Sequence, residues 1–347
     1  MAIVSFSSNS VMVIPSHIVL LYHRQTPVYI KAVNSKSKRE ENMADYKNIL
    51  FIRLSAFGDF ILTLGVMEAV RKYHPDAKIT LLTTPLFEDL AKQSGYFDQV
   101  LTMQRYRFAE IGKWLGLRRM MRKQRFDLVY DMQQNDRTKI LRLLSPAPAR
   151  KNWYRGGATS KQVLTITDSR VFPIPDMPWM DGDTGAFALK PPFVLLVPGA
   201  APQHPLKRWP AENYGILAQK LAKEGFQPVI LGGPAEQEIA AEVAGHEDTA
   251  LNLCGQTSFG DIAALARQAL AAIGNDTGPM HLISAAGCPV ISLFGGTSQP
   301  EQSAPNGKNV TVLRAIPIEK LPPEDVWQGF AETIRKSAAA GAETRSA

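Results

Sequence analysis

Cysteine is scarce in this chain of 347 residues, where only Cys254 and Cys288 are present. Two thiols cannot form the disulfide framework of a small secreted domain, and their spacing matches no metal-binding pattern. The six histidines form no cluster with cysteines or carboxylates, so the sequence predicts no catalytic metal site and no metal cofactor. We expect both cysteines to be reduced and buried in a cytoplasmic protein.

Apolar runs long enough to cross a bilayer are also missing. Residues 11–21 are apolar, but the run is short, is interrupted by Pro15, and lacks a preceding basic segment. It is therefore too short for a membrane span and makes a poor signal peptide. We expect residues 1–43 to be a flexible extension or an upstream start, and the patterned sequence to begin near Met43.

What is present is the composition of a two-domain globular protein, with 45% hydrophobic and 20% charged residues. Its net charge of +7 is divided unevenly along the chain. Residues 44–183 carry 22 Lys and Arg against 15 Asp and Glu, whereas residues 184–347 carry 12 against 15. The first half therefore either meets an anionic partner, such as nucleic acid, anionic lipid or a phosphorylated glycolipid, or has a basic solvated surface.

Short apolar runs alternate with helical patterns from residue 48 onward, which is the signature of parallel β-α-β units. Strands are predicted at residues 49–54, 78–83, 99–103 and 127–131, and again at 193–197, 227–231, 271–274 and 290–294. The turn-rich stretch at 173–183 predicts a linker. We expect an α/β protein with two Rossmann-like, doubly wound parallel-sheet domains facing a central cleft, at residues 44–183 and 184–337, followed by a disordered tail at 338–347.

The first strand-to-helix turn, at residues 53–59, has neither the three-glycine dinucleotide fingerprint nor the lysine-containing phosphate loop. The sequence thus supports neither a dehydrogenase nor a P-loop nucleotidase. Asp59 instead places a carboxylate where the cleft is expected. It is either a general base for a sugar hydroxyl or a helix cap.

The turn at residues 275–281 is the most informative stretch of the second half. Gly278 permits a close approach of the backbone to a ligand, and Pro279 suits the first position of a helix. Backbone N–H groups there, with the Thr277 hydroxyl and His281, favour a diphosphate site over a purely structural turn. Asp276 would repel a phosphate, so we expect it to cap the helix.

Two further loops follow predicted strands in the second half. The loop with Gly199 and Ala200 leads to the cations Lys207 and Arg208, which fits either an anion site or a helix entry with incidental charge. The loop after residue 231 contains two glycines, which is typical of a loop that contacts the edge of a bound nucleoside. There Glu236 or Glu238 either reaches ribose hydroxyls or is an ordinary acid of a first helical turn.

Residues 105–125 hold eight cationic side chains against a single acid, Glu110, with apolar residues interleaved. The apolar face predicts a helix covering the first sheet. The charges favour contact with an anionic membrane surface. Arg155 and its neighbours extend the same basic rim.

Taken together, these stretches resemble the ADP-heptose:lipopolysaccharide heptosyltransferase family, which is glycosyltransferase family 9. The resemblance covers about residues 47–330 and rests mainly on "ILFIRLSAFGDFILT", "VPGAAPQHPLKRWPAENY" and "IGNDTGPMHLISAAGCPVISLFG". It implies a GT-B architecture, with the donor bound mainly by the carboxyl domain and the acceptor by the amino domain. It also implies inverting, metal-independent transfer of a heptose from ADP-heptose to the lipopolysaccharide inner core, at the cytoplasmic face of the inner membrane and without nucleic acid.

The resemblance also implies roles for single residues. Asp59 would be the catalytic base and Lys207 would neutralise the leaving diphosphate. The implied donor-binding residues are Gly199, Ala200, Glu236, Glu238, Thr257, Asp276, Thr277, Gly278 and His281. The implied acceptor-binding residues are Arg137, Lys139 and Arg155.

The sequence departs from the family between Gly199 and Lys207, where relatives carry more hydroxyl and Trp side chains. The loop at residues 131–137 is only loosely similar to the family's acceptor loops. Asp181 and Asp183 resemble a two-carboxylate metal clamp, but they lie in the predicted linker. Two alternatives are a GT-B sugar-nucleotide epimerase, for which a cluster of acid and base residues is missing, and a non-catalytic nucleotide- or glycolipid-binding protein, which Asp59 and Lys207 disfavour.

Overall fold

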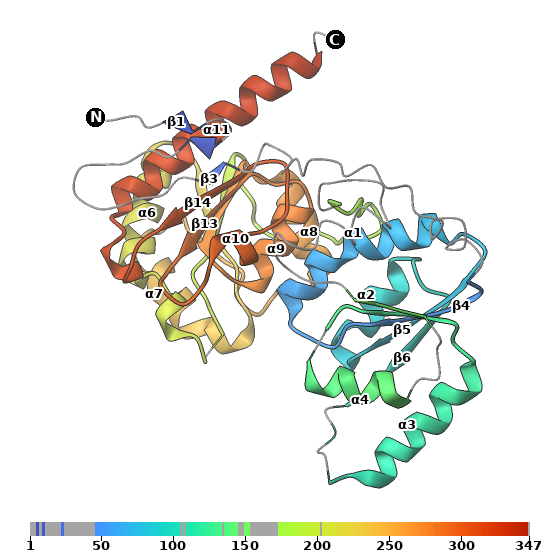
Figure 1. The fold of residues 1–347 in the computed structure, drawn as a ribbon. Helices are drawn as coiled ribbons and strands as arrows, with labels where there is room; N and C mark the ends of the chain where they lie inside the picture. The colour runs from blue at the N-terminus through green and yellow to red at the C-terminus, as the bar shows by residue number, and fades with distance from the viewer. Residues whose placement is uncertain are drawn as a thin grey trace. The chain divides into compact units, whose positions relative to one another are not determined.

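The computed structural model describes residues 5–6, 9–10, 22–23, 46–104, 106, 109–133, 135–144, 149–152, 173–201 and 203–345. The chain forms two compact units (Figure 1). The first domain comprises residues 27–179, and the second comprises residues 180–347 together with residues 1–26. The chain passes from one to the other between Trp179 and Met180, within the turn-rich stretch that the sequence predicts as a linker.

The first domain is built on a five-stranded parallel sheet in the order β6-β5-β4-β7-β8. Its strands are β4 (Asn48–Ile52), β5 (Lys78–Thr83), β6 (Gln99–Thr102), β7 (Leu128–Asp131) and β8 (Ala149–Asn152). Its helices are α1 (Phe57–Tyr73), α2 (Glu88–Gln93), α3 (Ile111–Gln124) and α4 (Asp136–Leu144), with the 3-10 turn η2 (Pro85–Phe87). The central strands β4 and β7 are fully buried, as expected of a sheet covered on both faces.

Alternating side chains of the first sheet divide between its two faces. Leu50 and Ile52 of β4 pack in one hydrophobic cluster with Trp114 of α3 and Leu141 of α4. The helix α3 therefore covers the sheet with its apolar face, as the sequence predicts. Phe51, which lies between Leu50 and Ile52, points to the other face of the sheet. There it stacks on Tyr130 of β7, with ring centroids 5.0 Å apart.

The second domain has a seven-stranded sheet in the order β11-β10-β9-β12-β13-β14-β3. All neighbouring strands are parallel except β14 and β3, which are antiparallel. The strands are β9 (Phe193–Val197), β10 (Gln227–Ile230), β11 (Leu251–Asn252), β12 (Ala271–Asn275), β13 (Val290–Phe294), β14 (Val310–Arg314) and β3 (Tyr22–His23). The helices are α6 (Ala211–Lys223), α7 (Gln237–Ala244), α8 (Phe259–Gln268), α9 (Gly278–Ala285), α10 (Pro300–Ser303) and α11 (Pro323–Arg345), with the 3-10 turns η4 (Pro205–Lys207), η5 (Pro234–Glu236) and η6 (Ile318–Lys320).

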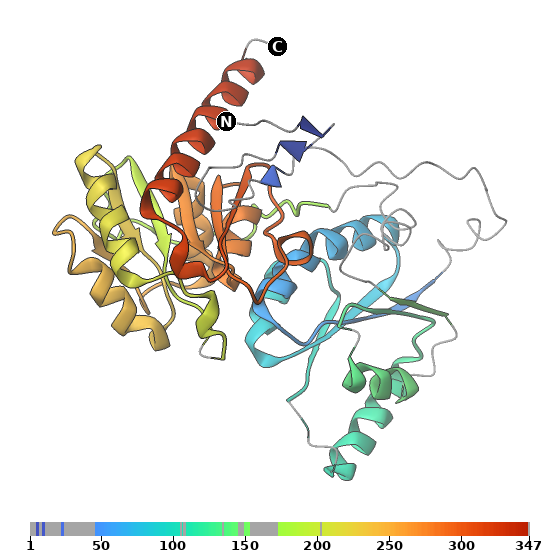
Figure 2. The ribbon, with the colours of Figure 1, turned by 60° about the vertical axis from the view of Figure 1, so that its left-hand side comes forward.

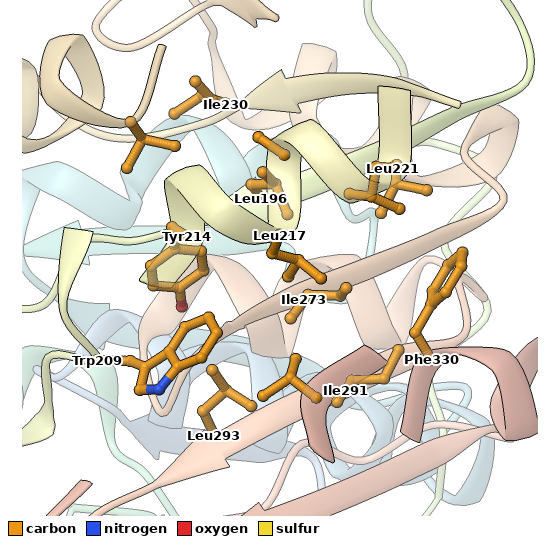
Figure 3. Packing of buried hydrophobic residues seen from close by; sticks show 14 of the residues in the cluster. Leu196, Trp209, Tyr214, Leu217, Leu221, Ile230, Ile273, Ile291, Leu293 and Phe330 are labelled. Carbon is orange, nitrogen blue, oxygen red and sulfur yellow. The ribbon is translucent and has the colours of Figure 1, made fainter. Parts of the chain in front are cut away.

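One face of the second sheet is covered by α6, α7 and α11, whose apolar side chains form a single core with the strands (Figures 1 and 2). Figure 3 shows Trp209 beside Tyr214 in this core, with Ile273 and Leu293 of the sheet next to them. The indole Nε1 of Trp209 donates to the carbonyl oxygen of Leu321 at 2.8 Å, so this buried polar atom is satisfied. A Cβ added to Gly274 would lie 2.7 Å from the Met280 sulfur, which places α9 against the opposite face.

Some features differ from the sequence-based expectations. The helix α11 continues to Arg345, through the segment predicted to be a disordered tail, because the run of alanines from 338 to 340 has the highest helix propensity. The strands β8, β11 and β14 were not predicted. They are short or carry polar residues, so their apolar pattern is weak.

The predicted N-terminal extension, residues 1–43, lies mostly outside the described residues. The exceptions are β1 (Ser5–Phe6), β2 (Asn9–Ser10) and β3, which pairs with β14. Within the part of the chain that the structure describes, no helix is both long and apolar enough to cross a membrane.

Candidate functional site

The strand order of the second sheet reverses between β9 and β12. From β9 the chain proceeds to β10 and β11 on one side, and from β12 to β13 and β14 on the other. In doubly wound sheets, ligands bind beyond the carboxyl ends of the strands at such a switch point. The loop with Gly199 follows β9 and the turn with Asp276 follows β12. Two stretches predicted from the sequence therefore meet at the expected place.

Lys207 and Asp276 are brought together at this end of the sheet. The ammonium nitrogen of Lys207 donates to Oδ2 of Asp276 at 2.7 Å, and the two side chains are 21% and 4% exposed. The predicted role of Asp276 as a helix cap is wrong. The helix α9 begins after Thr277 and has no side-chain cap, because the Asp276 carboxylate faces the lysine instead. The pairing also leaves Lys207 as a cation held at the carboxyl ends of the central strands.

The uncapped start of α9 leaves backbone donors available. The N–H groups of Gly278 and Met280 lie in the first turn, where a helix provides no internal acceptors. The hydroxyl of Thr277 is buried and has no hydrogen-bond partner among the described residues. The His281 side chain lies on the same turn, 6% exposed, with Nε2 at 3.9 Å from Oδ1 of Asp276. These predicted donor-binding residues thus surround one helix amino terminus, which attracts anions.

Asn275 was missed as a site residue by the sequence reasoning. Its side chain is fully buried at the end of β12 and contacts the loop after β9 as well as the segment after Lys207. A polar residue that ends an otherwise apolar buried strand, directly before Asp276, was the available signal. The partners of its amide group lie far away in sequence, so the pattern alone could not reveal them.

Gly199 lies against the carboxylate of Glu236. A Cβ added at Gly199 would lie 1.9 Å from Oε1 of Glu236, so only glycine fits there without moving that carboxylate. Oε2 of Glu236 accepts a hydrogen bond from the backbone N–H of Gly233, the N-cap residue of η5, at 2.8 Å. The contact joins the two glycine loops that the sequence assigns to donor binding.

Ala200 is buried, and its carbonyl oxygen accepts a hydrogen bond from Nη2 of Arg208 at 2.8 Å. Arg208 also lines a shallow pocket of about 300 Å³ beside the first turn of α6. Glu238 is exposed and lines the same pocket, whereas Glu236 lies at Gly199. The two predicted ribose partners therefore occupy different places, and Glu236 is the one that lies at the switch-point loops.

Thr257 is half-buried and directly precedes Ser258, which caps α8 by accepting from the backbone N–H of Asp261. Three residues before Thr257, Cys254 is buried, and its thiol donates to the carbonyl oxygen of Gly233 at 3.1 Å. Burial raises the pKa of this thiol above its ordinary value, as it does for Cys288. Both cysteines are therefore free thiols in the folded chain, as expected.

In the first domain, Asp59 lies in the first turn of α1, after the central strand β4. Its carboxylate is 31% exposed and forms an ion pair with Nη2 of Arg53 at 2.9 Å. Arg53 is itself nearly buried and also donates to the Met132 carbonyl oxygen. The alternative role of Asp59 as a helix cap is not seen, since the N-cap residue of α1 is Ala56 and no side chain caps it.

Gln133 is a second residue that the sequence reasoning did not single out. Its Oε1 accepts hydrogen bonds from the backbone N–H groups of Leu54 and Ser55, both at 2.9 Å. It thereby ties the loop after β7 to the loop that carries Asp59. These two loops follow β4 and β7, between which the order of the first sheet reverses.

The predicted acceptor-binding residues are less well defined by the structure. Arg137 is half-buried and Lys139 is exposed, and both lie on α4. Arg155 lies outside the described residues. The described cations of α3 and its C-cap are mostly exposed, together with Ile111 and Leu115, which are 66% and 56% exposed.

The two carboxylates of the predicted linker have different partners. Asp181 lies 3.6 Å from Nη1 of Arg267, and Oδ1 of Asp183 accepts from the N–H of Gly185 at 2.8 Å. Among the residues that the structure describes, no group of three histidine, cysteine or carboxylate side chains is placed to hold a metal ion.

Comparisons with known proteins agree with this arrangement. Residues 176–325, which include the whole second-domain site, match the family model of glycosyltransferase family 9 (heptosyltransferase). Lipopolysaccharide heptosyltransferase 2 of Escherichia coli (strain K12) is 23% identical over 327 residues, covering 82% of this chain and 93% of that protein.

Two solved structures share the fold of both domains. ADP-heptose lps heptosyltransferase II of E. coli superposes with a TM-score of 0.70 at 20% identity, covering 84% of this chain and 99% of the other. The E. coli heptosyltransferase WaaC with ADP gives a TM-score of 0.67 at 19% identity, covering 82% and 99%. The two parallel-sheet domains thus form a GT-B fold. Within residues 176–325 this chain matches glycosyltransferase family 9, and over most of its length it is similar to a lipopolysaccharide heptosyltransferase.

Proposed function

We propose that the chain transfers a heptose, or a related sugar, from an ADP-sugar to an acceptor in the lipopolysaccharide inner core. The observation that carries the proposal is the cation Lys207, held by Asp276 at the switch point of the second sheet among unpaired backbone donors. Such a site suits the diphosphate of a nucleotide-sugar. The relatives named above are lipopolysaccharide heptosyltransferases, and WaaC was solved with ADP, which supports the same donor here.

The proposed mechanism is a single displacement that inverts the anomeric centre. An acceptor hydroxyl loses its proton to the Asp59 carboxylate, and its oxygen attacks the anomeric carbon of the donor. The bond from that carbon to the diphosphate oxygen breaks, and ADP leaves with the electron pair. Arg53 holds Asp59 in place through the ion pair at 2.9 Å.

The negative charge that develops on the leaving diphosphate is the second requirement of this reaction. Lys207 supplies a positive charge, and the N–H groups at the start of α9 supply preorganised dipoles. Together they perform the task that a divalent cation performs in other glycosyltransferases, so we propose metal-independent transfer. Full activity in excess chelator is expected, and strict dependence on added metal would contradict this part of the proposal.

The acceptor is an anionic glycolipid, so we also propose that the protein works at the cytoplasmic face of the inner membrane. The exposed side chains of Ile111 and Leu115 lie on a helix whose remaining exposed residues are largely cationic. A basic helix with some exposed apolar side chains suits an anionic membrane surface.

The test of the enzymatic proposal is transfer from ADP-heptose to a heptose-deficient lipopolysaccharide by the purified chain. Asp59→Ala and Asp59→Asn should lower the turnover number by about 10²- to 10⁴-fold, the usual contribution of a general base. The dissociation constant for ADP should stay within about twofold, because Asp59 belongs to the other domain from the diphosphate site.

Asp89→Ala is a matched control, because Asp89 is an exposed carboxylate in the first turn of another helix of the same domain. It should leave turnover unchanged. Wild-type turnover in Asp59→Asn would refute the role of Asp59 as the base. Titration with ADP-, GDP- and UDP-sugars tests the donor, and preference for UDP-sugars without any transfer would favour the epimerase alternative.

A further inference from the structure

We propose that Asn275 is a positioning residue that turns the backbone N–H groups of Gly199 and Ala200 toward the diphosphate of the donor. The inference rests on the proposed function and adds a residue to it. Asn275 is fully buried, so its side chain cannot contact solvent or a bound ligand directly. Its effect on the donor is therefore expected to pass through the groups to which it is bonded.

The side-chain amide of Asn275 uses its full hydrogen-bonding capacity. Oδ1 lies 3.1 Å from the backbone nitrogen of Trp209, which donates to it, and 3.2 Å from the Tyr214 hydroxyl. Nδ2 donates to the carbonyl oxygens of Pro198 at 2.8 Å and Gly199 at 3.3 Å. An amide side chain offers two acceptor lone pairs and two N–H donors, and each lies within hydrogen-bonding distance of a partner here. The single hydroxyl proton of Tyr214 is shared between Oδ1 and the Val197 carbonyl oxygen, which is also 3.2 Å away.

These partners belong to two of the stretches that form the site, and Asn275 itself belongs to the third. Pro198 and Gly199 follow β9, and Trp209 follows Lys207 by two residues. Asn275 directly precedes Asp276, which pairs with Lys207. One buried amide thus joins the glycine loop, the lysine segment and the α9 turn.

The bonds to two successive carbonyl oxygens determine the direction of the following N–H groups. In a trans peptide, the carbonyl of one residue and the N–H of the next point in opposite directions, and both peptides of Gly199 are trans. Because the carbonyls of Pro198 and Gly199 point toward Asn275, the N–H groups of Gly199 and Ala200 point away from it. Neither N–H has a partner among the described residues.

Two successive N–H groups on the same side of the chain form a concave anion site. Such a nest is favourable only if its peptide planes are held before the ligand arrives, since reorienting them would reduce the affinity. The pair of bonds from Nδ2 provides that preorganisation. Without them, the Pro198–Gly199 loop is free to rotate its carbonyl groups toward the diphosphate, where they would repel it.

The test compares binding of ADP with binding of adenosine, because only ADP carries the diphosphate. Asn275→Ala and the isosteric Asn275→Asp are titrated calorimetrically with ADP, and adenosine binding is followed by ligand-observed NMR. Both variants should bind ADP at least tenfold more weakly and adenosine within twofold of the wild-type chain. Asn275→Asp should bind ADP more weakly than Asn275→Ala, because its carboxylate would face two carbonyl oxygens.

Thr311→Val is the matched control for stability, since Thr311 is a buried polar residue of the same sheet, bonded to Thr333 and not to the site loops. It should lower the melting temperature and leave ADP affinity unchanged. Tyr214→Phe removes the hydroxyl shared between Oδ1 and the Val197 carbonyl oxygen, but it keeps both bonds from Nδ2 to Pro198 and Gly199, so ADP affinity should fall less than threefold.

Two outcomes would overturn the inference while leaving the proposed function intact. One is wild-type ADP affinity in both Asn275 variants, and the other is an equal loss of ADP and adenosine affinity, which indicates general disruption. A wild-type chain that fails to bind ADP at all would instead refute the proposed donor. As a direct readout, ADP should shift the amide resonances of Gly199 and Ala200 downfield in the wild-type chain and not in Asn275→Ala.

Discussion

Lys207 and Asp276 show how much a single contact changes the interpretation of a motif. The two residues are 69 positions apart in the chain, and their ion pair of 2.7 Å forms only in the folded second domain. A carboxylate beside a phosphate looks unfavourable in the sequence, which is why a capping role was predicted for Asp276. Paired with the lysine, it instead orients the cation that we propose binds the donor, and part of its own charge is neutralised.

His74 is a residue-scale case outside the site, at the C-terminal end of α1. It is 2% exposed, and its Nε2 lies 3.0 Å from the buried hydroxyl of Tyr130. Burial lowers the pKa of His74 from 6.5 to about 4. Between pH 6.5 and about pH 4, His74 is therefore protonated in the unfolded chain and neutral in the folded chain. Stability is full above pH 6.5 and falls as the pH drops toward 4, by up to about 3 kcal/mol.

We expect His74→Gln, which retains a polar contact for Tyr130, to remove most of this acid sensitivity. Urea unfolding at pH 7.5 and at pH 4.5 measures it as the difference in unfolding free energy between the two conditions. His204→Gln, at an exposed histidine, should keep the wild-type difference. An equal difference in His74→Gln and the wild-type chain would show that another group is responsible.

At the scale of the element, α3 combines two faces that the sequence alone presents as one basic, aromatic run. Trp114, Leu117 and Met121 are buried at positions spaced as one helical stripe. Leu115 and Ile111 lie outside the stripe and are exposed. Helical geometry thus explains why equally apolar neighbours in the sequence have different environments.

A pair of leucines on this helix provides a matched prediction. Leu117→Ala should lower the unfolding free energy by about 2 to 4 kcal/mol, because it leaves a cavity in the first-domain core. Leu115→Ala should change it by less than about 0.5 kcal/mol, since that side chain is 56% exposed. Chemical denaturation of the two variants checks this, and similar losses would contradict the orientation of α3.

At the scale of the whole molecule, the charge is divided between domains of similar architecture. Residues 44–183 contribute a strong positive excess and residues 184–347 a small negative one. A nucleotide-sugar needs one cation in a defined site, whereas a glycolipid in a charged membrane is attracted by a broad basic surface. The division is consistent with our proposal that the second domain binds the donor and the first domain binds the acceptor.

Sedimentation with vesicles tests the membrane contact. The chain should bind vesicles containing phosphatidylglycerol and lose that binding near 1 M salt, where the Debye length falls to about 3 Å. Arg119→Glu with Arg122→Glu, both exposed on α3, should weaken binding at least tenfold. Lys223→Glu with Lys308→Glu makes the same net-charge change at exposed positions of the second domain and should have little effect. Equal weakening by both pairs would indicate a general charge effect instead.

Most of the strands and helices could be predicted from the chain, because fully buried parallel strands are continuous apolar runs. The strands at 78–83, 193–197 and 290–294 have the predicted bounds. The strand β14, which lies between β13 and β3, and the extent of α11 were not predicted. At the chain end, helix propensity outweighs hydrophobic pattern.

The sequence by itself determined the fold class, a resemblance to glycosyltransferase family 9 and the stretches that are candidates for binding and chemistry, since glycines and apolar periodicity are local features. It also identified Asp59, Lys207 and the turn after β12 as candidates. Only the tertiary structure decided what those residues contact. Arg53 pairs with Asp59, Gln133 holds the loop between them, and Asn275 joins three segments of the proposed donor site. These contacts depend on which strand ends become neighbours at the switch points, and strand order is not a local property of the chain.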